Sequence, residues 1–381
     1  MKLLSIEPTP SPNAMKLNVD ERVERGRTYT KDNLQSAPPL IRKLLDIPGV
    51  KSVFRTADFL SLERYPNADW KRVLEEVRAV FGENAAAGLP SHFADEGGFV
   101  EARLYVQVFR GIPMQIRVRT DGAEVRRALP DRFASAAMEA GYASPNLIRE
   151  RKLEDWGVRY GEAEEIADQA VAEIEAAYGD ERLRQLVEQA KKAAPGDDVL
   201  PEWRNLSDQE IAGHLDHPDW RVRYQAFGQL RPSEDNLPLI ARALQDDNAS
   251  MRRLAVVYLG EVGSPEALGM LIGALKDRSA AVRRTAGDTL SDLGAREAIR
   301  PMTEALEDEN KLVRWRAARF LYEHGDETAI EALQKAADDE EFEVALQARM
   351  ALDRITGGQE AEGAVWQQMA RAREKGEEGI E

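Results

Sequence analysis

The residues whose spacing could most readily do chemistry are two histidines, His214 and His217. Their separation suits a metal site, but a zinc ion would need at least one more ligand from elsewhere in the chain. Because Pro218 follows directly, a turn near a helix end is the favoured interpretation. The chain has four histidines and no cysteine, which excludes disulfides, thiolate nucleophiles and zinc–thiolate sites. We therefore predict no metal and no other cofactor.

Paired carboxylates, as in Asp246-Asp247 and Asp338-Asp339, are the second candidates for chemistry. Acid–base catalysis needs two carboxyl groups whose pKa values are pushed apart by their surroundings. These pairs lie in segments predicted as turns, where aspartates commonly cap helices. The sequence also has no phosphate-binding glycine loop, no Gly-x-Ser-x-Gly elbow and no His-Glu-x-x-His motif. We predict that the protein is not an enzyme.

The aspartates belong to a pattern that recurs about every 31 residues in five gap-free segments. Each segment has an apolar anchor, another apolar residue seven positions later, an alanine four positions on and a leucine after four more. The last three lie on one face of a helix, and alanine lets neighbouring helices approach closely. The segments resemble short bacterial HEAT repeats, which implies an all-α solenoid over residues 205–357. The anchors are Leu215, Leu244, Leu275, Leu306 and Ala337, and the alanines are Ala226, Ala255, Ala286, Ala317 and Ala348.

A ridge of aromatic and basic residues is predicted on the second helix of each repeat. Positions two and six after the first apolar residue of that helix point away from the repeat core. Tyrosine, tryptophan and arginine are enriched among the residues that dominate protein interfaces. We therefore predict a partner-binding ridge; the alternative is a solvated face whose arginines pair with the turn aspartates. The ridge consists of Tyr224, Arg253, Arg284, Trp315 and Arg319.

Residues 1–90 are predicted to form an α+β domain in the order β-β-α-β-β-α. Strands are expected over 2–6 and 14–19, a helix from Ser36 to about Asp46, two strands within 50–64, and a final helix after Asp69. The segments EPTPSPNAMKLNVDE, SAPPLIRKLLDIPGVKSVF and DFLSLERYPNADWKRVLEEV resemble the N-terminal domain of Nfu/NifU iron–sulfur scaffold proteins. In that family a separate Cys-x-x-Cys domain holds the cluster, so the resemblance implies the accessory module without cluster chemistry.

Residues 98–195 are predicted to form a second α+β module. Alternating apolar residues over 99–120 indicate two strands, and the pattern over 124–194 indicates helices. Arg110, at the turn before Gly111 and Pro113, suggests either a binding loop or an ordinary hairpin turn, and the turn is favoured. A linker is expected at 195–198 and a charged tail at 358–381.

The whole chain, including VQVFRGIPMQIRVRTDG, resembles the conserved virulence factor C family, which joins an Nfu-like domain to HEAT repeats. The resemblance implies a role in virulence or stress regulation. The net charge of −16 argues against nucleic acid as a partner. No segment suits a membrane span or a secretory signal, so we expect a cytoplasmic protein.

The predicted function is a non-catalytic adaptor or scaffold that binds a protein partner through its repeats, with a link to iron–sulfur assembly as one option. The alternatives from other classes are an enzyme of the HEAT-like lyase type and a nucleic-acid-binding HEAT-like protein.

Overall fold

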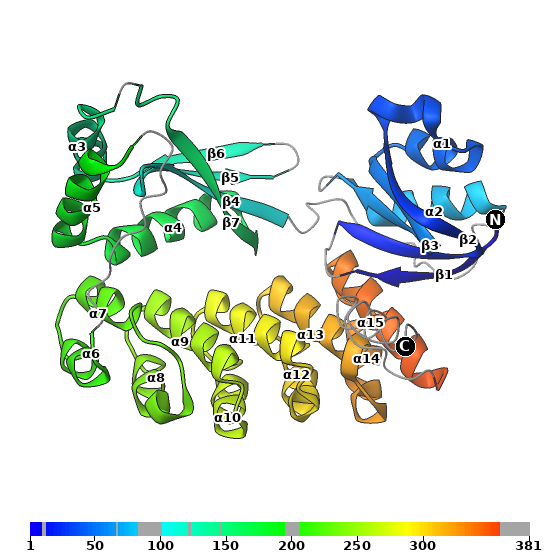
Figure 1. Cartoon of the computed structure of the whole chain (residues 1–381). Helices are drawn as coiled ribbons and strands as arrows, with labels where there is room; N and C mark the ends of the chain where they lie inside the picture. The colour runs from blue at the N-terminus through cyan, green and yellow to red at the C-terminus, as the bar shows by residue number, and fades with distance from the viewer. Residues whose placement is uncertain are drawn as a thin grey trace, which may run out of the picture. The chain divides into compact units, whose positions relative to one another are not determined.

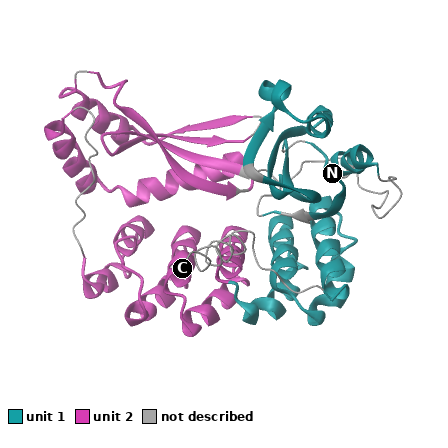
Figure 2. Ribbon diagram, turned by 45° about the vertical axis from the view of Figure 1, so that its right-hand side comes forward, with its two compact units in different colours: residues 1–101, 294–381 teal, residues 102–293 magenta. Residues whose placement is uncertain are grey.

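The computed structural model describes residues 1–9, 13–65, 68–82, 101–120, 123–144, 146–194 and 206–358. The chain divides into two compact units, residues 1–101 with 294–381 and residues 102–293 (Figure 2). Each unit contains one globular α+β region and part of the helical repeats (Figure 1). The predicted multidomain class is confirmed. The linker at 195–198 and all but the first residue of the tail lie outside the described residues.

In the first unit, the N-terminal region is a three-stranded antiparallel sheet in the order β1-β2-β3, packed against two helices. Alternate residues of the strands, such as Leu17, Leu60 and Leu62, are fully buried. Trp70 and Val77 of α2 are buried in the same core, as expected from an amphipathic helix. The elements are β1 (Leu3–Pro8), β2 (Ala14–Thr30), a 3-10 helix (Lys31–Ser36), α1 (Pro39–Asp46), β3 (Val50–Arg64) and α2 (Trp70–Phe81).

Two details of this region differ from the sequence prediction. The segments expected as two strands within 50–64 form a single strand, β3, which stays paired to β2 through register shifts around Ala57. The backbone at Ala57 has φ of 44°, so the strand bends there without ending. The helix expected from Ser36 begins only at Pro39, because residues 31–36 form the separate 3-10 helix.

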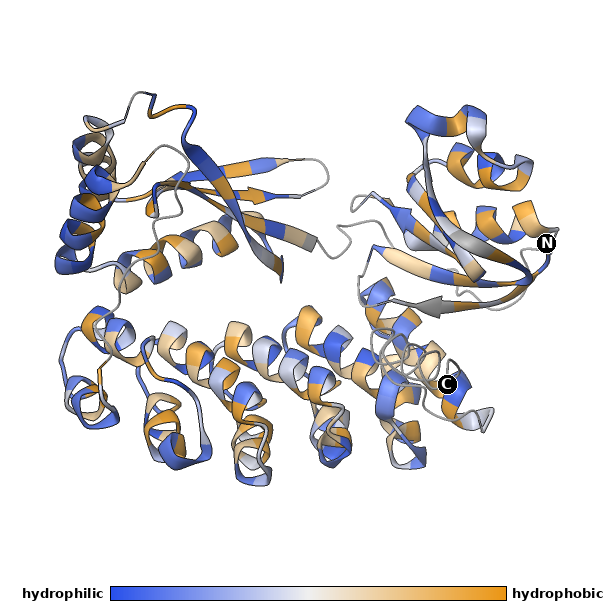
Figure 3. Ribbon diagram, viewed as in Figure 1, coloured by the Kyte–Doolittle hydropathy of each residue, from blue (hydrophilic) through white to orange (hydrophobic). Residues whose placement is uncertain are grey.

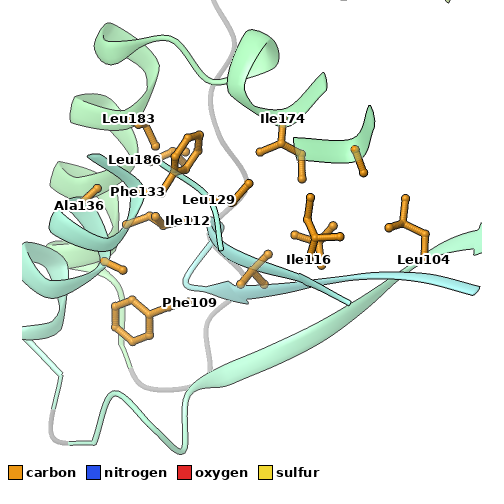
Figure 4. Close-up of a cluster of buried hydrophobic side chains, with 14 of the residues drawn as sticks. Leu104, Phe109, Ile112, Ile116, Leu129, Phe133, Ala136, Ile174, Leu183 and Leu186 are labelled. Carbon is orange, nitrogen blue, oxygen red and sulfur yellow. The ribbon is translucent and has the colours of Figure 1, made fainter. Parts of the chain in front are cut away.

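In the second unit, the middle region is a four-stranded sheet in the order β6-β5-β4-β7. Its elements are β4 (Glu101–Phe109), β5 (Ile112–Arg119), β6 (Glu124–Ala128), α3 (Asp131–Gly141), β7 (Arg151–Tyr160), α4 (Ala163–Ala177) and α5 (Asp180–Lys192). One face of the sheet packs on these helices through a core that includes Ile116, Phe133, Ile174 and Leu186 (Figure 4). Alternation of apolar and polar residues along β4 and β5 produces this one-sided burial (Figure 3).

The prediction of helices over 124–194, with breaks at 141–145 and near 157–161, is wrong in two places, where β6 and β7 form. β6 carries Arg126 and Arg127, and most of β7 is exposed, so neither strand shows the apolar alternation that signals burial. The favoured interpretation of Arg110 is confirmed: Arg110 and Gly111 form the β4–β5 turn with φ of 43° and 79°. The Arg110 side chain bonds to Glu150 at 2.6 Å and to the Ala190 carbonyl at 2.6 Å.

Residues 206–358 form five helix pairs, one for each predicted repeat. The anchors lie at the end of each first helix, and the repeated alanines are buried in each second helix. In the second unit the helices are α6 (Asp208–His214), α7 (Trp220–Phe227), α8 (Leu237–Ala243), α9 (Ala249–Val262), α10 (Pro265–Ala274) and α11 (Ala280–Leu293). In the first unit they are α12 (Ile299–Ala305), α13 (Lys311–His324), α14 (Ile330–Ala336) and α15 (Phe342–Thr356).

Arginine–aspartate ion pairs connect successive repeats within each unit. Arg252 of α9 donates two hydrogen bonds, 2.7 and 2.9 Å long, to Asp277 in the turn of the next repeat. The same guanidinium donates to the Asp246 carbonyl of its own repeat at 2.8 Å. Asp277 in turn accepts from the Ser279 backbone amide at 2.7 Å, so the aspartate holds the turn rather than capping the helix directly. The equivalent pairs are Arg223–Asp246 and Arg314–Asp339.

Candidate partner-binding surface

The predicted ridge is largely covered in the second unit, and the middle region of the same chain covers it. Tyr224 of α7 is only 9% exposed. Its phenol has a raised pKa because of burial and because the Glu173 carboxylate of α4 lies near it. Helix α4 packs against α7. The first ridge residue therefore contacts the protein's own middle region.

Glu173 of α4 connects the middle region to the repeats, and both of its carboxylate oxygens are hydrogen-bonded. Arg253, the second ridge residue, donates to Glu173 Oε1 at 2.8 and 3.2 Å. Arg159 of β7 donates to Glu173 Oε2 at 3.0 Å. A buried carboxylate is costly unless it is paired and hydrogen-bonded, and here two guanidinium groups neutralise it. The arrangement fixes α4 of the middle region to α9 of the repeats.

Two glycines let side chains of the repeats approach the middle region closely. A Cβ atom added to Gly161 would lie 2.8 Å from Nη1 of Arg284, the third ridge residue. A Cβ atom added to Gly179 would lie 2.7 Å from the side-chain oxygen of Gln225. Burial lowers the pKa of Arg284. At both points the missing side chain makes room for a polar group of the repeats.

In the first unit, the ridge residues Trp315 and Arg319 lie on α13 and are 4% and 5% exposed. Arg319 donates to Glu323 Oε1 of the same helix at 2.9 and 2.8 Å. Its guanidinium carbon lies 5.8 Å from the centre of the Trp315 ring, within cation–π range. Within this unit the two residues belong to one buried polar cluster, whereas Tyr224, Arg253 and Arg284 face the middle region. Binding of an external protein to the ridge stays a prediction.

The N-terminal region also contacts the repeats, through β3 and α15. Arg64 of β3 is 1% exposed and donates to Glu343 Oε1 at 2.9 Å. Burial lowers the pKa of Arg64, and the adjacent Glu343 carboxylate partly opposes that shift. The Arg64 guanidinium also stacks 5.0 Å from the Trp70 ring centre. Beside this pair, Phe342 and Leu346 of α15 pack against the N-terminal core.

Sequence reasoning does not single out Glu173 or Arg64, although each leaves a signal. Glu173 follows Ile166 and Ala170 at helical spacing, so a carboxylate stands on the buried face of α4. Arg64 follows Leu60 and Leu62 at strand spacing, so a guanidinium stands on the inward face of β3. A charge at a core position indicates a partner from another element.

The remaining chemical candidates have structural roles. His217 Nδ1 accepts a hydrogen bond from the Asp219 amide at 3.1 Å, in the turn that leads into α7. In the part of the chain that the structure describes, no cluster of histidine and carboxylate side chains is arranged to hold a metal ion. No described helix is both long and apolar enough to cross a membrane.

Family models match three parts of the chain. Residues 4–88 match the N-terminal domain of the scaffold protein Nfu/NifU, residues 107–187 match the virulence factor family, and residues 210–287 and 268–353 match HEAT repeats. Conserved virulence factor C of Staphylococcus haemolyticus is 44% identical, and the match covers 97% of this chain and 99% of that protein. The chain belongs to the conserved virulence factor C family.

A second full-length relative agrees with this membership. The protein YpgR of Bacillus subtilis is 49% identical, and the match covers 99% of this chain and 100% of that protein. The crystal structure of protein SAV1430 from Staphylococcus aureus is 42% identical, covering 21% of this chain and 99% of that one, with a TM-score of 0.20. The family models and the two full-length relatives confirm the predicted family, including its combination of an Nfu-like region with HEAT repeats. None of these descriptions names a catalytic activity.

Proposed function

We propose that the chain is a non-catalytic cytoplasmic adaptor whose HEAT repeats hold the Nfu-like and middle regions in place for binding a protein partner. The observation that carries this proposal is the pair of contacts from Glu173 to Arg253 and Arg159. These contacts use the predicted ridge to bind a folded region. Arginine and tyrosine at such positions are the residue types that dominate protein interfaces.

The ridge thus makes its first contacts within the same chain. It consists of Tyr224, Arg253, Arg284, Trp315 and Arg319. An external protein that binds the ridge in the second unit must share it with α4 or displace α4. The Nfu/NifU match supports iron–sulfur assembly proteins as the partners to test first. The chain has no cysteine, so a thiolate-ligated cluster does not fit it, and the proposed role in that pathway is protein contact alone.

The test is affinity purification from native cytosol with quantitative mass spectrometry, using the intact chain beside two charge reversals. Arg253→Glu places a second carboxylate beside Glu173 and should free the middle region. Arg221→Glu is the matched control, because Arg221 of α7 also lies near the middle region but is 46% exposed and 3.6 Å from Glu175. We expect a defined protein to be retained by the intact chain and the control and lost from Arg253→Glu.

Two other results would count against the proposal. If the intact chain retains nothing above background, the adaptor function is wrong. If Arg253→Glu retains the same protein with the same affinity when both are purified, the adaptor function stands, but the held middle region has no part in it.

A further inference from the structure

The sheet of the middle region has a second face, which its helices do not cover. Residues of β4, β5 and β6 that point away from the core form this face, and several are well exposed: the side chains of Arg103, Arg119 and Arg126 are 56%, 45% and 59% exposed. We call it the open face. Its members are Arg103, Tyr105, Gln107, Gln115, Arg117, Arg119, Glu124 and Arg126.

The strand register places like charges opposite one another on the open face. Arg117 of β5 stands opposite Arg126 of β6, and Arg103 of β4 stands opposite Arg119 of β5. Like charges directly opposite across two strands destabilise a sheet. Arg117 makes no ion pair with any carboxylate of the described residues, and its Nε donates only to Gln115 at 3.1 Å. Arg103, Arg119 and Arg126 are each paired with a carboxylate, which leaves Arg117 as the arginine of this face that can take one from a partner.

Two carboxylates of the chain already pair with arginines of the open face, and these pairs show how the face binds a carboxylate. Glu124 lies between two guanidinium groups, accepting from Arg119 Nε at 2.6 Å and from Arg126 Nε at 2.5 Å. Asp155 of β7 pairs with Arg103 at 2.9 Å. The arginines outnumber these two carboxylates. Tyr105 lies opposite Arg117 and has the Arg119 guanidinium carbon 5.1 Å from its ring centre, which adds an aromatic surface beside the charges.

We propose that the open face binds an acidic segment of a partner protein, whose carboxylates pair with Arg117 and Arg126 while an apolar side chain packs on Tyr105. The inference rests on the proposed adaptor function and names the chemistry of its partner. Arginine forks match carboxylates in two-point contacts, which makes them suited to this recognition. Charge complementarity supports it, because these arginines gather in a chain whose net charge is −16.

Single-stranded nucleic acid is the competing ligand, and two observations disfavour it. Sheets that bind single strands stack successive bases on several aromatic side chains. Among the residues that β4, β5 and β6 contribute to the open face, Tyr105 is the one aromatic residue. The chain's overall negative charge also repels a long polyanion more than it repels a short acidic segment.

The experiment measures fluorescence anisotropy of a labelled short polyglutamate peptide on the full chain at low ionic strength, beside a single-stranded oligonucleotide of similar length. The test variant is Arg117→Gln/Arg126→Gln. The matched control is Arg184→Gln/Arg300→Gln, which removes the same charge from helix positions that are 76% and 91% exposed. We expect the test variant to bind the peptide about tenfold more weakly. The control should bind it like the intact chain.

A second readout separates a binding role from a structural one. The variant removes the like-charge pair and also the exposed Arg126–Glu124 ion pair, which contributes little, so its melting temperature should stay close to that of the intact chain. The inference is overturned if the intact chain does not bind the peptide, if both variants lose binding equally, or if the oligonucleotide binds more tightly and depends on the same arginines. In each of these cases retention of a cytosolic protein by the intact chain would still support the adaptor function.

Discussion

Arg253 of the second repeat donates two hydrogen bonds to Glu173 of the middle region, 2.8 and 3.2 Å long, and Glu173 is only 4% exposed. The same carboxylate accepts from Arg159, so one acidic side chain is shared between the region that carries it and the repeats. Neither arginine is fully buried, with 19% and 21% of their side chains exposed. Removing the Glu173 carboxylate would therefore leave two arginines without this ion-pair partner, whereas removing one arginine would leave Glu173 paired with the other.

The first prediction concerns Glu173→Gln, which keeps the shape of the side chain and removes its charge. The two guanidinium groups then lose their anion, and the free energy of unfolding of the second unit should fall by about 1–3 kcal/mol. Hydrogen exchange should accelerate in α4 and in α7, because their packing is released, and remain unchanged in α14.

Glu175→Gln provides the control for that substitution. Glu175 is on the same helix, but its side chain is 29% exposed and lies 3.6 Å from Arg221. An exposed pair contributes little, so exchange in α4 should match the intact chain. Equal acceleration by both substitutions would show that the effect comes from α4 itself and not from its contact with the repeats.

The repeat region shows how far periodicity alone can predict a fold. The alanines expected at the closest helix contacts, Ala255 and Ala286 among them, are fully buried. Gly263 and Gly294 adopt positive φ of 61° and 64°. Gly325 ends α13 in an extended conformation instead. Each repeat uses the same local packing, so regular spacing predicts the helices and their buried faces well.

The long-range contacts could not be predicted in the same way. The ridge residue Tyr224 occupies an outward position of its own helix, yet α4 covers it. Helical spacing states only where a side chain points, and it says nothing about which distant segment lies there. The same limit applies to β7, whose mostly exposed residues carry no alternation and are placed by pairing with β4.

The second prediction concerns Arg64 and Glu343. Glu343→Ala would leave the Arg64 guanidinium, 1% exposed, without its carboxylate. Removing one partner of a buried ion pair typically costs about 3–5 kcal/mol. We expect a lower melting temperature. We also expect faster proteolysis of the N-terminal region and of α15, because the contact between them is weakened. Glu63→Ala, which removes the 37% exposed partner of Lys51, should cost less than about 1 kcal/mol. Equal losses for the two variants would contradict the assignment.

The third prediction concerns pH and the aspartates between repeats. Burial raises the pKa of Asp277, but hydrogen bonds from Arg252 and the Ser279 amide outweigh it and hold the pKa below its usual value. A carboxyl group with a lowered pKa in the folded state adds stability above its unfolded pKa, which is about 3.9. That contribution is lost as the pH falls through the folded pKa. Asp277→Asn should therefore be less stable at neutral pH and lose less stability on acidification.

Asp247→Asn is the control for the titration, since Asp247 is a fully exposed aspartate 3.6 Å from Arg278. Thermal unfolding of the three proteins at neutral pH and near pH 3 checks the prediction. If Asp277→Asn loses as much stability on acidification as the intact chain and Asp247→Asn do, the Arg252–Asp277 pair makes no such contribution.

The fourth prediction uses Gly161, whose φ of 138° and missing side chain both matter. Alanine there would strain the backbone and place its Cβ atom 2.8 Å from Arg284 Nη1. Gly157→Ala is the matched control, because Gly157 has φ of 85° but nothing within 4 Å of an added Cβ atom. Each substitution should cost about 1–2 kcal/mol of backbone strain. Only Gly161→Ala should also increase hydrogen exchange in α11, because the Arg284 side chain must move.

A double substitution isolates that second effect. In an Arg284→Ala background, the clash with the guanidinium is gone, so Gly161→Ala and Gly157→Ala should have similar costs. Their difference in the native background then measures the contact between the middle region and α11. Gly161→Ala could instead change hydrogen exchange in α11 equally with and without Arg284. Backbone strain alone would then explain the effect of replacing Gly161, and the close approach of Arg284 would have no energetic role.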